Sequence, residues 1–316
     1  MKKYNTILSI FIFYILLNMI LFPKVYIDQT LNGITAWAFN VLPSILPFII
    51  FTKILSSLGT IDKISKVFSK PCKFLFNTPA ISSYVFFTSI ISGYPVGAKL
   101  TSDLFIEGKI TKEEAFRMTS FCSTSGPMFI IGAVGIGMLS NALYGYIIFI
   151  SHILGAILNG IIFKRFKTKN NCNHIKNIKS QSNNSANTIN KNFNLSNIIV
   201  DSSLSIISVG VIIAIFFVII TSLNPIFNLF PSNIASILEG LIEITKGCID
   251  ISTTMSGIIS VIAITFIISF GGLSTILQSI TMLNKLQMPI WLFTLQKLSH
   301  AILSTIIALL LSLLFL

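Results

Sequence analysis

The sequence predicts an all-α polytopic membrane protein with about seven transmembrane helices and two re-entrant hairpins arranged as inverted repeats. Three observations support this fold class. Of the 316 residues, 53% are hydrophobic and only 10% are charged, a composition typical of membrane proteins. Apolar runs long enough to cross a bilayer, about 20 residues each, recur along the whole chain. Polar interruptions also fall at corresponding places in its two halves.

Seven runs are long and apolar enough to span a membrane. They are residues 4–22, 35–57, 119–140, 142–163, 198–223, 255–280 and 290–316. The first run has the charged start of a signal peptide, but it has no small-residue cleavage site, and Pro23 and Lys24 follow it. We therefore interpret residues 1–34 as an uncleaved N-terminal membrane helix and loop, with a cleaved signal as the weaker alternative.

The composition excludes several functional classes. The net charge of +12 does not indicate a nucleic-acid partner, because the basic residues lie in loops between apolar runs. The cysteines form no CxxC pair, so neither a disulfide framework nor a metal site is expected at Cys72, Cys122, Cys172 and Cys248. There is no GxSxG, P-loop or HExxH motif, so we expect neither an enzyme nor a cofactor, with catalysis by Glu243 as a minor alternative.

Lysines indicate the topology. Lys2 and Lys3 place the N-terminus in the cytoplasm, and two crossings then return the lysine-rich loop 58–75 to the same side. The Asn-rich linker 164–197 carries seven Lys and Arg residues and no acidic residue, so it should also be cytoplasmic and form a flexible tether. If all three intervening apolar runs crossed, the linker would lie outside. One of the three must therefore enter and leave on the same side.

Residues 80–108 best fit that requirement. Within them, Pro95 removes a backbone donor and disfavours a helical conformation of Tyr94. We interpret the segment as a re-entrant hairpin of two short helices that meet between Gly93 and Gly97. A proline-kinked spanning helix is the alternative, which the charge distribution disfavours. Thr111 and Glu114 have the spacing of a capping box and should start the next helix.

The second half contains its own polar segment, residues 231–253. It is too polar to span, and at helical spacing four charged residues fall on one face: Glu239, Glu243, Lys246 and Asp250. The sequence leaves open whether this is an amphipathic helix on the outer surface or a second re-entrant hairpin broken near Gly247.

The hairpin interpretation gives the two halves the same layout. Residues 35–163 and 198–316 then each run through a spanning helix, a polar hairpin, a broken helix and a spanning helix. The halves begin on opposite sides of the membrane, so they would be inverted repeats. The broken helices carry the polar stretches at 121–129 and 268–275.

Non-helical backbone is allowed at membrane depth only where it faces protein or water, so the four interruptions should line one cavity. Free N–H groups at the half-helix N-termini suit an anionic or hydroxyl-rich solute. For each Ser or Thr, the alternative is a hydrogen bond within its own helix. The candidate solute-binding residues at the breaks are Ser92, Gly93, Tyr94, Pro95, Gly97, Ser123, Ser125, Gly126, Pro127, Glu243, Thr245, Lys246, Gly247, Ser269, Gly271, Gly272 and Gln278.

Three further ionisable residues are candidates. Lys99 follows the first break and either reaches a ligand or extends to the lipid headgroups. Lys297 and His300 lie inside the last apolar run, where ionisable groups are costly and therefore suggest function. An interfacial position is the alternative for Lys297.

These motifs carry a family resemblance. "SGYPVGAKLTSDLFIEGKITKEEAFRMTSFCSTSGPMFIIGAVGIGM" (92–138) closely resembles the signature region of the nucleoside-recognition, or Gate, domain membrane proteins of the sporulation YlbJ type. "EITKG" (243–247), "SFGGLSTILQ" (269–278) and "LQKLSHAIL" (295–303) are similar to that family's later motifs. The resemblance covers about 35–316. It implies a fold related to concentrative nucleoside carriers and a role in making the endospore cortex.

Two functional hypotheses follow. The first is a carrier or gated pore that binds a small polar solute and is embedded in membrane lipid. The second is a non-transporting scaffold that recruits sporulation factors through the basic linker. Metal-ion permeation is a weaker third idea, since no Cys, His or carboxylate cluster lies at the breaks.

Overall fold

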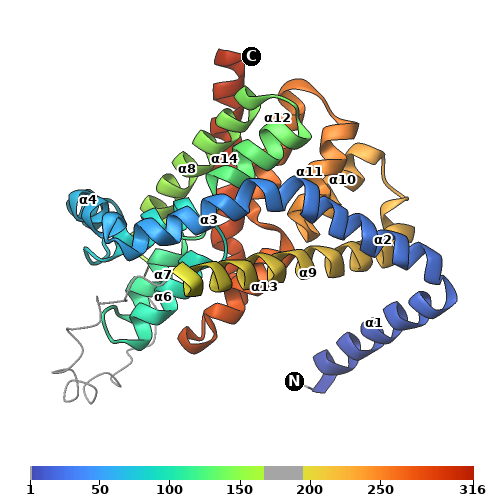
Figure 1. Cartoon of the computed structure of the whole chain (residues 1–316), viewed down its shortest axis with the longest axis horizontal. Coiled ribbons are helices and arrows are strands. Elements are labelled where there is room, and N and C mark those ends of the chain that lie inside the picture. Colours follow the sequence, from blue (N-terminus) through green and yellow to red (C-terminus); the bar gives the residue numbers. More distant parts are fainter. Residues whose placement is uncertain (1, 167–194) are drawn as a thin grey trace.

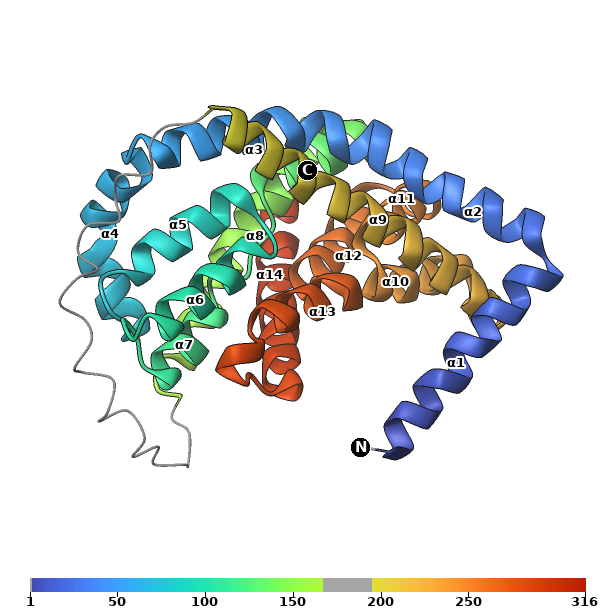
Figure 2. The same cartoon turned by 60° about the horizontal axis from the view of Figure 1, so that its bottom comes forward.

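The computed structural model describes residues 2–166 and 195–316, and all secondary structure in these two ranges is helical, as predicted (Figure 1). The chain begins with α1 (Lys2–Leu21), α2 (Pro23–Thr35), the π-helix η1 (Ala36–Val41) and α3 (Leu42–Ser57). The last three form one continuous helical stretch, which arches over the rest of the molecule in Figure 2. In the same view, α1 extends away from the other helices.

The remaining helices follow in two sets. The first comprises α4 (Thr60–Phe76), α5 (Ser82–Ser92), α6 (Val96–Ile106), α7 (Lys112–Thr119), the π-helix η2 (Met128–Met138) and α8 (Ala142–Phe163). The second comprises α9 (Leu195–Phe227), α10 (Ser232–Ile242), α11 (Ile244–Thr254), α12 (Gly257–Phe270), α13 (Gly272–Met282), the 3-10 turn η4 (Asn284–Leu286) and α14 (Ile290–Phe315).

Within the described ranges, 5 helical stretches are long and apolar enough to cross a membrane: Pro23–Ser57, Ala142–Phe163, Leu195–Phe227, Gly257–Met282 and Ile290–Phe315. The chain is thus a multi-pass membrane protein. Two of the seven predicted spans, 4–22 and 119–140, are not among them. The first corresponds to a shorter apolar helix, and the second is divided by non-helical residues 120–126.

The predicted break at residues 92–97 separates α5 from α6, which pack against each other and are called the first hairpin here. Gly93 occupies the turn with φ +74° and ψ −167°, a conformation that only glycine adopts without strain. Its backbone also approaches the next chain break closely, because a Cβ at Gly93 would lie 2.9 Å from the Gly126 nitrogen. The capping box predicted at Thr111 and Glu114 starts α7.

The segment 231–253 also forms two packed helices, α10 and α11, which are called the second hairpin here. A single amphipathic helix over this segment is therefore wrong. The break lies at Glu243 instead of near Gly247: Glu243 has an extended backbone, and its carboxylate caps α11 by accepting a hydrogen bond from the Lys246 nitrogen at 2.7 Å. Gly247 instead packs against Gly240, where a Cβ would overlap the neighbouring backbone.

Two further chain breaks complete the layout. Residues 120–126 are non-helical between α7 and η2, and Gly271 separates α12 from α13 with φ +94°. The helices that end the two halves, α8 and α14, pack against each other, and α14 also packs along α12. Apart from α4 in the first half, each half runs through a long helix, two packed short helices, a broken helix and a long helix. Their arrangement as inverted repeats stays a prediction.

Most of the predicted linker 164–197 lies outside the described residues, including Cys172 and His174. Its flexibility and its cytoplasmic position stay predictions.

Candidate functional site

The chain breaks of both halves meet at one cavity of about 120 Å³. The tip of the first hairpin contributes Ser92, Gly93 and Tyr94, and the first broken helix contributes Ser125 and Gly126. The second half contributes residues 243–245 at its hairpin break, together with Ser274, Thr275 and Gln278 from α13. The sequence predicted that the interruptions would converge in this way, since non-helical backbone inside a membrane needs protein or water beside it.

The cavity has two unlike walls. The wall made by the breaks and α13 carries hydroxyl, amide and carboxyl groups. The opposite wall is apolar and comes from η1, α3 and α9, with Trp37, Phe48, Ile206, Val209 and Ile213 among its residues. Ser274 Oγ is buried without a hydrogen-bond partner in the described part of the chain. The cavity therefore suits a molecule with one apolar face and several hydrogen-bonding groups on the other.

Glu243 is the ionisable acid of the polar wall. Its side chain is 3% exposed, and its carboxylate is held by the backbone of α11. Glu243 lies outside the five candidate spans, and burial raises the pKa of its carboxyl to about 7. None of the cavity-lining residues in the described ranges is Lys, Arg or His. The wall thus offers acceptors and hydroxyls, without a fixed positive charge.

Directly behind the polar wall, Lys297 of α14 joins the two halves. Its Nζ donates hydrogen bonds to the Tyr94 hydroxyl and, at 2.9 Å, to the Ser123 carbonyl oxygen. It also lies 3.4 Å from His300 Nδ1 and 4.7 Å from the centroid of the Tyr94 ring. The Lys297 side chain is 2% exposed, so its interfacial placement is wrong. Lys297 instead connects the tip of the first hairpin to the last helix.

His152 of α8 links the same region to α12. Its Nε2 accepts a hydrogen bond from the Ser125 nitrogen at 2.9 Å, and its Nδ1 lies 2.8 Å from Ser269 Oγ. The His152 carbonyl oxygen lies 2.9 Å from His300 Nε2. These contacts imply that both imidazoles are neutral, with the hydrogen on Nδ1 of His152 and on Nε2 of His300.

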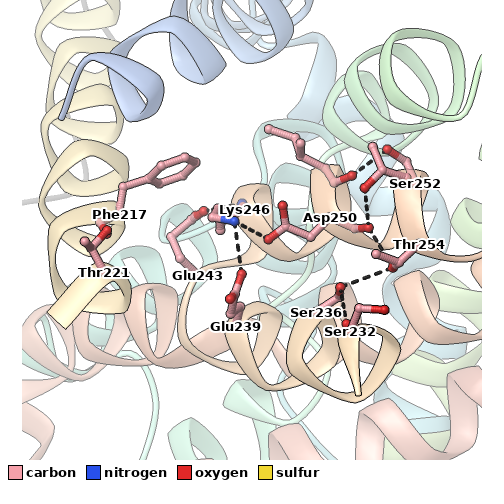
Figure 3. A network of polar contacts seen from close by, with 12 residues as sticks. Phe217, Thr221, Ser232, Ser236, Glu239, Glu243, Lys246, Asp250, Ser252 and Thr254 are labelled. Atoms are coloured by element: carbon pink, nitrogen blue, oxygen red, sulfur yellow. Dashed lines mark hydrogen bonds and ion pairs between the residues drawn. The ribbon is translucent and has the colours of Figure 1, made fainter. Parts of the chain in front are cut away.

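The second hairpin carries a different charged cluster, shown in Figure 3. Lys246 Nζ lies 3.0 Å from a Glu239 oxygen and also contacts the Asp250 carboxylate. All three side chains are less than a quarter exposed, and the ammonium lies 6.0 Å from the ring centroid of Phe217 on α9. Lys246 therefore pairs with two carboxylates of its own hairpin and is not among the residues that line the cavity.

The structure brings eight of the predicted residues to the cavity wall: Ser92, Gly93, Tyr94, Ser125, Gly126, Glu243, Thr245 and Gln278. The other candidates lie elsewhere. Lys99 is exposed, and Gly97 and Gly247 make close helix contacts. The rest, besides Lys246, flank the breaks or lie behind the wall: Pro95, Ser123, Pro127, Ser269, Gly271, Gly272 and His300.

Sequence reasoning missed several residues of this region. His152 lies in the apolar run 142–163, and the rule that singled out Lys297 and His300 as ionisable groups inside a span applies equally to it. Asn159 and Gln296 are also buried, where Asn159 Nδ2 donates to the carbonyl oxygens of Ser120 and Gln296 at 2.7 and 3.0 Å. Ser274 and Thr275 lie in the predicted polar stretch 268–275 but were not among its candidates, and Trp37 at the cavity wall carries no local signal.

Comparisons with known proteins agree with the motif resemblance. Residues 38–140 match the family described as "Gate: Nucleoside recognition". The chain is also 31% identical over 170 residues to the "Sporulation integral membrane protein YlbJ" of Bacillus subtilis (strain 168), an alignment that covers 54% of this chain and 42% of that protein. The chain thus spans less than half the length of that relative. No solved structure matches it significantly.

Proposed function

We propose that the chain is a carrier or gated pore for a small polar solute, and not an enzyme, with its binding site shared between two inverted repeats. The observation that carries this proposal is the convergence of three chain breaks, two from the first half and the one at Glu243 from the second, on one cavity that α13 also lines. Such paired breaks at the interface between repeats are the usual structure of a transporter binding site. In this proposal both hairpins are re-entrant, and the N-terminus and the linker are cytoplasmic.

The chemistry of the wall narrows the solute class. Glu243, Tyr94, Gln278 and the hydroxyl groups offer hydrogen bonds on one side, whereas Trp37 and Phe48 offer an apolar surface on the other. A neutral molecule with a planar apolar part and several hydroxyl or N–H groups fits both walls. The family description "Nucleoside recognition" supports the same class. A role in forming the spore cortex is proposed from the resemblance to sporulation proteins.

A substitution at Gly93 tests this proposal. In Gly93→Leu, the new side chain would be forced into a glycine-only conformation beside Gly126, at the edge of the cavity. The full-length chain is purified in mild detergent, and the small molecules that it retains are identified by mass spectrometry. We expect wild type to retain a polar solute and Gly93→Leu to lose at least about tenfold of it, equivalent to about 1.4 kcal/mol of binding free energy.

Gly137→Leu is the matched control. Gly137 is exposed, has no positive φ and has only ordinary contacts around its position, so this variant should retain the solute like wild type. Normal abundance and a single elution peak are required of all three proteins. If Gly93→Leu retains the solute as wild type does, the cavity is not the binding site. A scaffold would show no retained solute at all, and its function would instead depend on residues 170–193.

A further inference from the structure

Lys297 has an unusual environment for a buried cation. Its Nζ is surrounded by a phenol, a carbonyl oxygen and an imidazole nitrogen, from Tyr94, Ser123 and His300. In the described part of the chain, no carboxylate lies within ion-pair distance of it. A buried ammonium without a counter-charge is costly, whereas a neutral amine is not. The ammonium form of this lysine is therefore stabilised only by uncharged hydrogen-bond acceptors.

The groups that face Lys297 come from every element packed against it. The tip of the first hairpin presents Tyr94, α8 presents His152, and α14 itself presents His300. The segment 120–127 and the α12–α13 break present backbone atoms and hydroxyl groups, including the Ser123 carbonyl and Gly271. His152 is neutral in this arrangement because its Nε2 accepts from the Ser125 N–H, and His300 Nε2 donates to the His152 carbonyl oxygen. Glu243 is on the cavity wall and makes no ion pair with Lys297.

The contacts accommodate both protonation states of Lys297 with one change of hydrogen bonding. The ammonium has three N–H donors for three acceptors, and the Tyr94 hydroxyl can then donate toward the Ile268 carbonyl oxygen, 3.5 Å away. The neutral amine has two N–H donors and a lone pair, which accepts a hydrogen bond from Tyr94. Loss of one proton thus reverses the direction of the hydrogen bond between Tyr94 and Lys297.

We propose that Lys297 is a one-proton exchange site, loaded from the solute cavity through the hydroxyl group of Tyr94. Tyr94 lines the cavity and contacts Nζ, so it bridges the two. A hydronium ion in the cavity gives a proton to the Tyr94 oxygen while the Tyr94 hydrogen moves to Nζ. Water, an intact phenol and an ammonium are left, so the transfer is balanced in atoms and charge.

In the carrier proposed above, this site makes the proton the coupling ion. This part of the inference rests on the proposed function. Tyr94 lines the cavity, and its hydroxyl donates to a different partner in each state of Lys297, so we expect solute affinity and proton affinity to depend on each other. A solute that favours one orientation of the hydroxyl changes the proton affinity of Lys297. By linkage, protonation of Lys297 changes the solute affinity by the same factor.

The proton site is tested without any solute by nitrogen-15 NMR of histidine side chains in the full-length chain. The sequence has 3 histidines, and a His174→Gln background leaves only His152 and His300. The Nδ1 of His300 accepts from Lys297, so its chemical shift reports the charge of that donor. We expect the shift to follow a one-proton curve over about two pH units, while both imidazoles keep a single hydrogen.

Two variants should hold the site at opposite ends of this curve. Lys297→Arg cannot lose its proton, so His300 should keep the shift of the acid limit at every pH. Lys297→Met cannot gain one, so the shift should stay close to the alkaline limit. Lys246→Met removes a partly buried lysine outside this group of contacts and should leave the titration unchanged, provided that the protein still elutes as a single peak. Tyr94→Phe should retain the titration but slow proton exchange, so that one averaged resonance becomes two.

Three results would overturn this proposal. The first is a wild-type His300 shift that does not change between pH 5 and pH 10, about the range of biological buffers. The next is protonation of both ring nitrogens of His300 during the titration. The last is a titration in Lys297→Met that is the same as in wild type. If Tyr94→Phe behaves as wild type, the route through the hydroxyl is wrong. None of these results affects the solute-retention test, so the carrier and its proton site can fail separately.

Discussion

The two hairpins have the same shape, but different contacts hold them in place. The second hairpin is stabilised from within, since Lys246 pairs with Glu239 and Asp250, and Gly240 and Gly247 bring its two helices into contact. The first hairpin has no ion pair at its tip in the described structure. Instead its tip contacts Lys297 of the other half, and Gly97 packs against the Cys122 carbonyl of the neighbouring break.

This difference indicates a division of roles. A cation paired with two carboxylates of its own hairpin is a local structural feature, whose state changes little when neighbouring helices move. Lys297 shares its helix only with its partner His300, whereas Tyr94 and Ser123 lie on other elements, so its surroundings depend on how those elements sit together. We therefore expect the second hairpin to behave as a rigid unit, and the first hairpin to respond to solute and to the charge of Lys297.

The largest effect is expected from Gly97→Leu, which breaks the contact that positions the first hairpin. A Cβ at this position would overlap the Cys122 carbonyl, a backbone atom that cannot move aside as a flexible side chain can. We expect a loss of about 3 kcal/mol or more in the free energy of unfolding, with little protein recovered from the membrane. Size-exclusion chromatography with a thermal ramp measures this, with Gly137→Leu as control. A Gly97→Leu protein of normal stability would mean that the first hairpin does not depend on this contact.

The next largest effect separates the two lysines. Lys246→Met leaves two carboxylates close together without their cation, and we expect it to lower the free energy of unfolding by about 2–4 kcal/mol. Lys297→Met leaves no carboxylate behind and replaces the side chain with one of similar length, so its cost should stay below about 1.5 kcal/mol. Equilibrium unfolding in detergent measures the free energy of unfolding of both variants and of wild type.

A compensating variant provides the control for this comparison. When Glu239→Gln and Asp250→Asn accompany Lys246→Met, the repulsion between the two carboxylates disappears and most of the stability should return. Equal losses for the two single lysine variants would contradict the distinction between a structural and a functional cation.

The sequence predicted the positions of the chain breaks better than the contacts around them. Gly93, Pro95 and Gly271 signal breaks through local backbone chemistry, which the sequence displays directly. The break at Glu243 was assigned near Gly247, because glycine is the usual signal and an extended, helix-capping glutamate is not. Gly247 serves a tertiary contact with Gly240 that no local pattern reveals.

The polar contacts behind the cavity also show that tertiary contacts could not be predicted from local sequence patterns. Lys297 could be singled out as an ionisable residue inside an apolar run, but its partners Tyr94 and Ser123 lie 203 and 174 residues away in the sequence. Such pairs depend on how the two halves pack. His152, in contrast, could have been found with the rule already applied to α14, because it is equally out of place in an apolar helix.

The central claim is that both halves line one cavity, and two cysteines test it directly. In a chain whose four native cysteines are replaced, Ser92→Cys lies at the first hairpin and Gln278→Cys on α13. Each alone should react with a bulky polar maleimide. Together they should take up only one label per chain, because one adduct fills a cavity of about 120 Å³. The pair Ser92→Cys and Asn233→Cys, whose second position is exposed, should take up two. Two labels on the Ser92 and Gln278 pair would show two separate spaces and contradict the shared site.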